Sequence, residues 1–300
     1  MENEEYKNSL IAVATNTNKS ENQDSGGEFK GVNFNSIFIA DGLGSFVHPR
    51  IASEQVIEFF KAKASSLKVE DGKRFKPNFL TVFKEAKERL IEYAKQNIKE
   101  EEKQLPNLLG TTAIIVFETE EKLFIAYTGN GAVWHIRGNF NEFPDAYQFP
   151  WNVVNFLNPH TIPEGGKEAL YKLISDSPDF NECIPSVIEI EKDKILGDVI
   201  MICTDGIYSA DQVKAGKNEK GVWVKYEPSM LTFFKTLNNY FKVNYYNLDM
   251  LKVLLKIYLE EIKPSLDDDA TIGVLITKEV LNYQKKKVAV SNEANTGIKV

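Results

Sequence analysis

IFIADGLG, residues Ile37–Gly44, joins an apolar run to an acidic turn. Its first four residues are β-branched, aromatic or small and carry no charge, which is typical of a buried β-strand bounded by a turn. The strand ends by presenting the carboxylate of Asp41. Gly42 behind it has no side chain, so its carbonyl can approach a ligand closely. This junction predicts a buried strand with an acid at its end, in a position to contact a ligand.

Three further aspartates stand where predicted strands begin or end. Asp205 follows an apolar run and precedes a second glycine, Asp268 directly precedes an apolar run, and Asp24 lies in the predicted loop 20–24. Each alone is compatible with a solvated turn, but a rigid scaffold can point several such side chains at one centre. Mg²⁺ and Mn²⁺ prefer carboxylate and carbonyl oxygens, and two such ions can activate a water for attack on phosphorus. Four aspartates and the Gly42 carbonyl together favour a two-metal site over a zinc site.

The order of predicted elements favours an α+β domain rather than a parallel α/β sheet. Short runs rich in β-branched and aromatic residues predict strands, helical spacing of apolar residues predicts helices, and the helices come in two pairs between groups of strands. Strict alternation of strand and helix would indicate a parallel sheet, so the grouping favours antiparallel sheets. The predicted strands are 9–14, 36–40, 112–118, 123–127, 132–137, 186–190, 198–203 and 270–277, and the predicted helices are 51–61, 78–100, 229–241 and 247–262.

No linker rich in Pro, Gly or Ser and no internal repeat divides the chain, so one domain is expected over residues 1–279. Residues 280–300 are polar and contain three consecutive lysines, Lys285–Lys287, which predicts a solvated C-terminal tail.

Composition limits the classes of partner. The chain has 300 residues, of which 43% are hydrophobic and 26% charged, which is typical of a folded globular protein. The net charge of −7 opposes binding to nucleic acid or to an anionic membrane, because both require a basic face. The two cysteines form no CxxC pair, the N-terminus has no signal-like apolar stretch, and no apolar run is long enough to span a bilayer. A cytoplasmic protein is therefore expected.

Taken together, the motifs resemble those of the metal-dependent type 2C (PPM-type) serine/threonine protein phosphatase family. The resemblance extends from about residue 9 to residue 277, and the motifs occur in the family's order. Each is weak alone, whereas the ordered set is specific. The motifs are Asn22-Gln23-Asp24, Asp41-Gly42-Leu43-Gly44, Gly110–Ala113, Ile125–Ala132, Ile202–Ile207 and Asp268–Thr271.

The resemblance implies a four-layer α-β-β-α fold, in which two packed antiparallel sheets are flanked by helix pairs. It implies two Mn²⁺ or Mg²⁺ ions bridged by Asp41, with Asp205 and Asp268 completing one shell. Asp24 and the Gly42 carbonyl would serve the other. A hydroxide bridging the ions would hydrolyse phosphoserine or phosphothreonine, making the protein a phosphoric monoester hydrolase. The implied partner is a phosphorylated protein, such as a serine/threonine kinase or its targets.

Several positions depart from the family's pattern. Lys19 stands where the family usually has an arginine, so it could contact phosphate only as a point charge, and a solvated loop lysine is the alternative. Leu43 stands where some relatives have a histidine proposed as general acid. His48 is the nearest candidate, but an exposed loop histidine is the more frequent situation, and the acid stays unassigned. His160, in the long connection between Tyr147 and Phe180, is expected to pack against the protein rather than act in the site.

Asn130 and Ser209 stand where many relatives have aspartates linked to a third metal, so a third ion is expected to be weak or absent. These departures leave open a noncatalytic member of the same fold that binds a phosphorylated partner or acts as a regulatory scaffold. A two-metal nuclease shares the carboxylate chemistry, but it would require a basic groove for its substrate, and the acidic composition opposes it.

Overall fold

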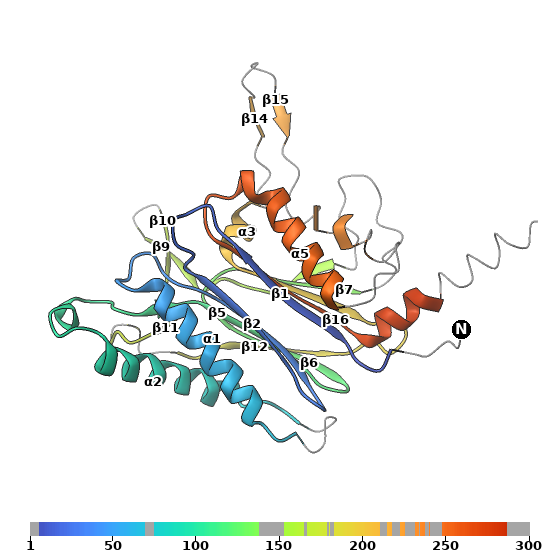
Figure 1. Cartoon of the computed structure of the whole chain (residues 1–300), viewed down its shortest axis with the longest axis horizontal. Helices are drawn as coiled ribbons and strands as arrows, with labels where there is room; N and C mark the ends of the chain where they lie inside the picture. The colour runs from blue at the N-terminus through green and yellow to red at the C-terminus, as the bar shows by residue number, and fades with distance from the viewer. Residues whose placement is uncertain are drawn as a thin grey trace, which may run out of the picture.

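Two five-stranded antiparallel sheets pack face to face and are flanked by helices (Figure 1). A computed structural model describes residues 6–69, 75–137, 153–164, 167–178, 180, 183–210, 215–217, 223–225, 232–233, 235–237, 240 and 248–286. The first sheet has the strand order β1-β16-β13-β7-β8 and the second β12-β6-β5-β3-β2. The predicted α+β class and four-layer α-β-β-α arrangement are therefore confirmed.

The strands of the first sheet are β1 (Leu10–Asn16), β7 (Ala132–Arg137), β8 (Val153–Asn155), β13 (Asp198–Cys203) and β16 (Ala270–Ile276). Those of the second are β2 (Asp24–Lys30), β3 (Asn35–Asp41), β5 (Ala113–Glu118), β6 (Lys122–Thr128) and β12 (Ser186–Glu191). Smaller pairs are formed by β4 (Gly110–Thr111) with β11 (Ile174–Ser175), β9 (Thr161–Glu164) with β10 (Lys167–Leu170), and β14 (Ala215–Lys217) with β15 (Trp223–Lys225). The helices are α1 (Pro49–Ser66), α2 (Phe79–Asn97), α3 (Asp205–Ala210) and α5 (Leu248–Ile262), with 3₁₀ turns η1 (Glu102–Gln104) and η3 (Lys263–Ser265).

The run Ile37–Ala40 is apolar throughout because both faces of β3 are buried. Ile37 and Ile39 pack between the two sheets, whereas Phe38 and Ala40 pack beneath α1 and α2. Alternate side chains of a strand point to opposite faces, so a central strand with a core on each side has no polar position. The other outer layer is α5, whose buried residues pack on the outer face of the first sheet. Figure 1 shows α1 and α2 on one side of the sandwich and α5 on the other.

Local signals explain the boundaries of the helices. Pro49 occupies the first turn of α1, where its missing N–H is not needed. Asn78 caps α2 by accepting a hydrogen bond from the Thr81 backbone N–H at 3.2 Å. The predicted helices 51–61, 78–100 and 247–262 correspond to α1, α2 and α5. Within the predicted helix 229–241, the structure describes residues 232–233, 235–237 and 240, all of which are helical. The remaining residues of this prediction lie outside the described residues.

The sequence prediction missed β2, and it placed Asp24 in a loop, whereas Asp24 is the first residue of this strand. The strand was missed because its sequence, DSGGEFK, is polar and contains two glycines. Close packing favours the glycines: a Cβ on Gly26 would collide with Val13, and one on Gly27 would have to displace the flexible end of the Lys61 side chain. At an edge of the sheet, backbone pairing with β3 forms the strand without a strong local preference.

The connection between Tyr147 and Phe180 contains short strands, β8 to β11, rather than a plain loop, while Trp151 lies outside the described residues. Beyond β16, residues 278–286 are helical, and Val280 and Leu281 pack into the core beside α5. The predicted boundary at residue 279 falls inside this helix, and the division of the chain there stays a prediction. None of the described helices combines the length and apolar character needed to cross a membrane.

Candidate metal centre

The four predicted aspartates lie together at one end of the sandwich. Asp24 and Asp41 are directly paired across β2 and β3. In the other sheet, β13 and β16 pair up to Cys203 and Ile272, which brings Asp205 beside the start of β16. The hydroxyl of Thr204 donates to Asp24 Oδ2 at 2.8 Å and links the two sheets at this end. Elements far apart in the sequence therefore supply carboxylates to one place.

Burial and mutual repulsion raise the pKa values of three of these carboxylates, those of Asp24, Asp41 and Asp205. Burial raises the pKa of Asp24 to about 7. Burial, followed by the negative charges of Asp24 and Asp205, raises the pKa of Asp41 well above its ordinary value. The pKa of Asp205 is raised mainly by burial, although a hydrogen bond from Asn130 opposes the shift. A cluster of this kind is destabilised when its members are ionised without a neighbouring cation.

The residues fit hard divalent cations in their chemistry. Asp24 Oδ1 is buried and has no hydrogen-bond partner among the described residues, so it is available as a ligand. Carboxylate oxygens are the donors that Mg²⁺ and Mn²⁺ prefer. As the side chains stand, no group of three or more Asp, Glu, His or Cys within the described ranges is already arranged around a common point. Several of them are instead directed at Lys19, Thr204 and Asn130.

The two Asp-Gly junctions bring backbone into close approach. A Cβ on Gly42 would collide with the Pro49 carbonyl at the start of α1, and one on Gly206 would collide with the Asp269 carbonyl. The Gly42 N–H donates to the Gln23 carbonyl at 3.2 Å, and the Thr112 N–H donates to the Asp41 carbonyl at 2.8 Å. Glycine is thus required at both positions, and the backbone around Asp41 is fixed from two sides.

Lys19 is placed at the site, where its ammonium group forms an ion pair with Asp268 and lies 3.9 Å from Asp269 Oδ2. Asp268 itself is half exposed, whereas the Asp269 side chain is buried. Asp269 accepts hydrogen bonds from the Thr17 hydroxyl and, at 2.8 Å, from the Gln23 N–H, and so organises the loop that carries Lys19. Sequence reasoning missed this role, for which the only signal was the run of three aspartates, Asp267–Asp269.

Asn130 takes part in the site through a hydrogen bond: its side-chain amide donates to Asp205 Oδ2 at 2.8 Å. Nothing in the described side chains bears on Ser209, so the weakness of a third ion stays a prediction. His48 occupies the N-cap position of α1 without a capping hydrogen bond from its side chain, and its Nε2 instead lies 3.0 Å from Glu102 Oε2.

His160 packs against the protein, as expected. Its Nδ1 accepts from the Gly129 N–H at 3.2 Å, its Nε2 lies 2.8 Å from the Ser186 hydroxyl, and its ring stacks on Tyr127. Burial and the charge of Lys172 lower the pKa of His160 to about 4. The neutral ring thereby supports the turn that positions Asn130.

Comparisons with known proteins show the family and the fold of this chain. The sequence matches the family model of protein phosphatase 2C over residues 14–254. No curated protein sequence matches it at a significant level. Among solved structures, the fold is similar to a bacterial serine phosphatase, with 15% sequence identity and a TM-score of 0.60 over 89% of this chain and 97% of that chain.

Two further solved structures are similar over the same 89% of this chain. The serine/threonine phosphatase Stp1 from Staphylococcus aureus shares 16% identity, with a TM-score of 0.58 over 94% of its chain. The catalytic domain of the serine/threonine phosphatase PstP, solved in complex with two manganese ions, shares 16% identity, with a TM-score of 0.54 over 98% of its chain. At such identities the structures establish a common fold. Because the family model covers most of its length, the chain belongs to the protein phosphatase 2C family.

Proposed function

We propose that this protein hydrolyses phosphoserine and phosphothreonine in proteins with the help of two Mn²⁺ or Mg²⁺ ions. The observation that carries the proposal is the convergence of Asp24, Asp41, Asp205 and Asp268 from both sheets, with raised pKa values on three of them. An uncompensated acidic cluster is unfavourable for folding, so its presence calls for a cationic partner. The match to the phosphatase family supports phosphate monoesters as the substrate class.

Each residue has a role in this proposal. Asp41, which interacts electrostatically with the other three aspartates, would bridge the ions. Asp205 and Asp268 would complete one ion's shell, and Asp24 with the Gly42 carbonyl would serve the other. Bound there, the ions would supply an activated water and neutralise charge on the phosphoryl oxygens. The substrate would be a phosphorylated cytoplasmic protein, such as a serine/threonine kinase or its targets.

One feature of the site favours the alternative of a noncatalytic phosphoprotein-binding or scaffolding member. Asp268 and Asp205 are already partnered by Lys19 and Asn130, so that two of the four carboxylates are partly compensated without metal. Metal binding would have to compete with the Lys19 ion pair. This pair is substantially exposed to solvent, and exposed pairs contribute only about 0–1 kcal/mol, so a divalent cation can displace it.

Phosphate release from a phosphothreonine peptide is expected to require added Mn²⁺ or Mg²⁺ and to stop when EDTA removes the metal. Release of inorganic phosphate by the purified protein measures this, and restoration by excess Mn²⁺ controls for damage by the chelator. Retained binding of the phosphopeptide without any turnover would instead support the noncatalytic alternative. Cleavage of DNA or RNA in Mn²⁺ would indicate a nuclease.

Replacing Lys19 by methionine is expected to lower kcat/KM for the phosphopeptide about tenfold, because a charge contact to phosphate is lost. Lys19→Arg should retain or raise activity, since a guanidinium can contact phosphate through two N–H groups. Steady-state kinetics of both variants test the predicted contact. If Lys19→Met were as active as the unaltered protein, Lys19 would be only a structural partner of Asp268.

A further inference from the structure

The far end of the sandwich carries a hollow that the metal centre does not use. Strand β1 runs from Leu10, paired with Ile276, to Asn16, paired with Ala270 near Asp268. Seven residues of strand span about 20 Å. The hollow lies beyond the Leu10 end, between the segment at Tyr6 and the helix 278–286, so it is a separate place on the molecule.

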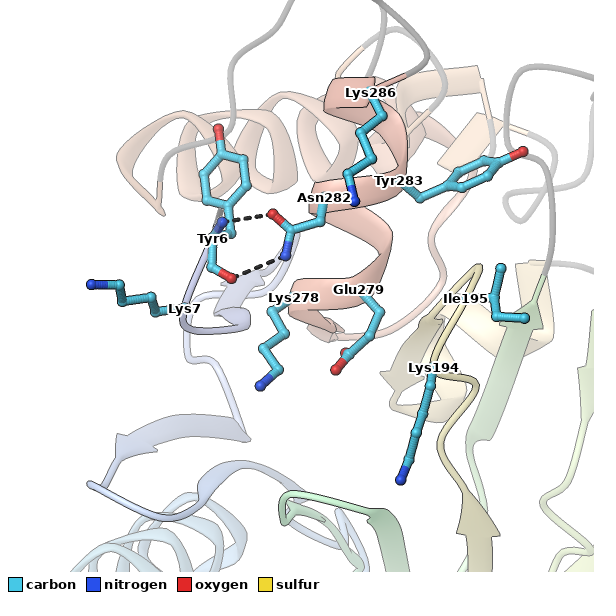
Figure 2. A pocket seen from close by; sticks show the side chains of 9 residues that line it. All are labelled: Tyr6, Lys7, Lys194, Ile195, Lys278, Glu279, Asn282, Tyr283 and Lys286. Carbon is cyan, nitrogen blue, oxygen red and sulfur yellow. Dashed lines mark hydrogen bonds between the residues drawn. The ribbon is translucent and has the colours of Figure 1, made fainter. Parts of the chain in front are cut away.

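This hollow has a volume of about 850 Å³ and is positively charged. Its lining includes Lys7, Lys194, Lys278 and Lys286 but only one acid, Glu279. Figure 2 shows that these side chains come from three segments: the N-terminal residues, the loop after β12 and the helix after β16. In a chain with a net charge of −7, such a grouping is a local feature and not a result of composition.

Among the described residues, two of these lysines have no counter-charge. In the part of the chain that the structure describes, the ammonium groups of Lys7 and Lys278 have no carboxylate within ion-pair distance. Lys194 lies 3.6 Å from a carboxylate of Glu121 but is largely exposed. The single acid, Glu279, lies 3.7 Å from the buried Lys192, which is also paired with Glu118 at 2.7 Å, so the charge of Glu279 is offset only in part. The hollow therefore keeps an excess of positive charge that a ligand could neutralise.

The hollow is also extended. A neighbouring one of about 210 Å³ shares Lys7 and Lys278 with it and continues between residues 31–35 and 118–120. Its lining also contains Glu118, which is paired with the buried Lys192, and Glu120, so the excess of lysines belongs to the first hollow and the shared edge. Each of the two has an apolar residue beside its lysines: Ile195 is 78% exposed in the first, and Val32 is 98% exposed in the second. Aliphatic side chains this exposed gain free energy when a partner covers them.

We call the surface formed by the residues that line the two hollows around Lys7 and Lys278 the lysine groove. We infer that the lysine groove binds a protein segment in which acidic and apolar residues alternate. Glutamate or aspartate side chains would pair with Lys7, Lys194 and Lys278. Apolar side chains between them would cover Ile195 and Val32. The groove would thereby recruit a partner protein at a site about 20 Å from the metal centre.

Other anionic ligands fit the groove less well. A free phosphate is much smaller than the two connected hollows and would not cover the exposed apolar residues. An anionic membrane is opposed by the net charge of −7, and its broad surface would not follow two neighbouring hollows. An extended peptide matches both the length and the mixed chemistry of the lining.

The test measures binding to the full chain, so its result does not depend on the proposed phosphatase activity. The probe is a fluorescein-labelled ten-residue peptide that alternates glutamate and leucine, followed by fluorescence anisotropy at low ionic strength. We expect saturable binding that weakens with salt, and a loss of at least about tenfold in Lys7→Glu/Lys278→Glu, since two exposed ion pairs become repulsive. The matched control Lys84→Glu/Lys95→Glu changes the same charge on the exposed face of α2 and should bind normally.

Thermal melting checks that both double variants fold, which is expected because neither Lys7 nor Lys278 has an ion pair to lose within the part of the chain that the structure describes. The inference is overturned if both double variants lose binding equally, or if a peptide with glutamine in place of glutamate binds as well. It is also overturned if the peptide does not bind, including the case in which inorganic phosphate or phosphatidylserine vesicles bind through these lysines instead.

Discussion

Asp41→Asn is expected to lose Mn²⁺-dependent phosphate release by about a thousandfold or more and, at the same time, to stabilise the metal-free protein. The loss follows because Asp41 is proposed to bridge both ions, which supply several kcal/mol of transition-state stabilisation. The gain follows because Asp41 is repelled by Asp24 and Asp205 in a buried place. Substitutions that relieve such strain commonly add about 1–2 kcal/mol, which is roughly 2–6 °C in melting temperature for a protein of this size.

The direction of the pKa shifts determines how the stabilisation by Asp41→Asn depends on pH. The pKa values of Asp24 and Asp41 are raised in the folded state, so the folded protein holds their protons more tightly than the unfolded chain does. Their contribution to stability is fully present below about pH 4. This stabilisation is lost as the pH rises and the carboxyl groups ionise. For Asp24 the loss occurs as the pH passes its folded-state pKa of about 7. The difference in melting temperature between Asp41→Asn and the metal-free unaltered protein should therefore grow from pH 5 to pH 8.

Differential scanning fluorimetry in EDTA and in Mn²⁺ measures both effects. Added Mn²⁺ should raise the melting temperature of the unaltered protein at pH 8 and should have little effect on Asp41→Asn. A matched control is Asp249→Asn, which removes a carboxylate from the first turn of α5, away from the cluster. The assignment of Asp41 would be wrong if Asp41→Asn responded to Mn²⁺ as the unaltered protein does.

Strands buried on both faces were predictable from sequence because their pattern is local. The predicted strands 132–137 and 198–203 agree with β7 and β13 residue for residue. Strand β2 was missed because tertiary packing decides it: Gly26 and Gly27 fit beneath neighbouring side chains, and pairing with β3 supplies the hydrogen bonds. The short strands β9 to β11 lack any strong local pattern and were missed for the same reason.

Asp41, Asp205 and Asp268 were predictable because each stands beside a predicted strand, whereas Asp24 was placed in a loop and was indicated by the order of the family's motifs. Their partners were not predictable. The ion pair between Lys19 and Asp268, the hydrogen bonds accepted by Asp269 and the amide contact from Asn130 all join residues far apart in the chain. No periodicity or spacing encodes such pairs. The same holds for the lysine groove, whose lysines come from three separate segments.

Lys192→Met is expected to lower the free energy of unfolding by about 3–5 kcal/mol, or roughly 10 °C in melting temperature. The Lys192 and Glu118 side chains are only 3% and 4% exposed, and Lys192 Nζ lies 2.7 Å from Glu118 Oε1. Glu118 also accepts hydrogen bonds from Ser9 at 2.6 Å and from Asn35 at 2.8 Å. Removing the lysine leaves a buried carboxylate without a cation at the point where the starts of β1 and β3 meet the end of β5.

Two matched variants separate this cause from the loss of packing. Lys252→Met removes a lysine whose ion pair with Glu28 is partly exposed, so it should cost no more than about 1 kcal/mol. Adding Glu118→Gln to Lys192→Met removes the unpaired charge, keeps one acceptor oxygen for the Asn35 amide and presents an N–H that the Ser9 hydroxyl can accept, so it should recover at least half of the loss. Urea denaturation at pH 7 measures all three variants. If Lys192→Met were no more destabilising than Lys252→Met, the buried ion pair would not stabilise this end of the sandwich.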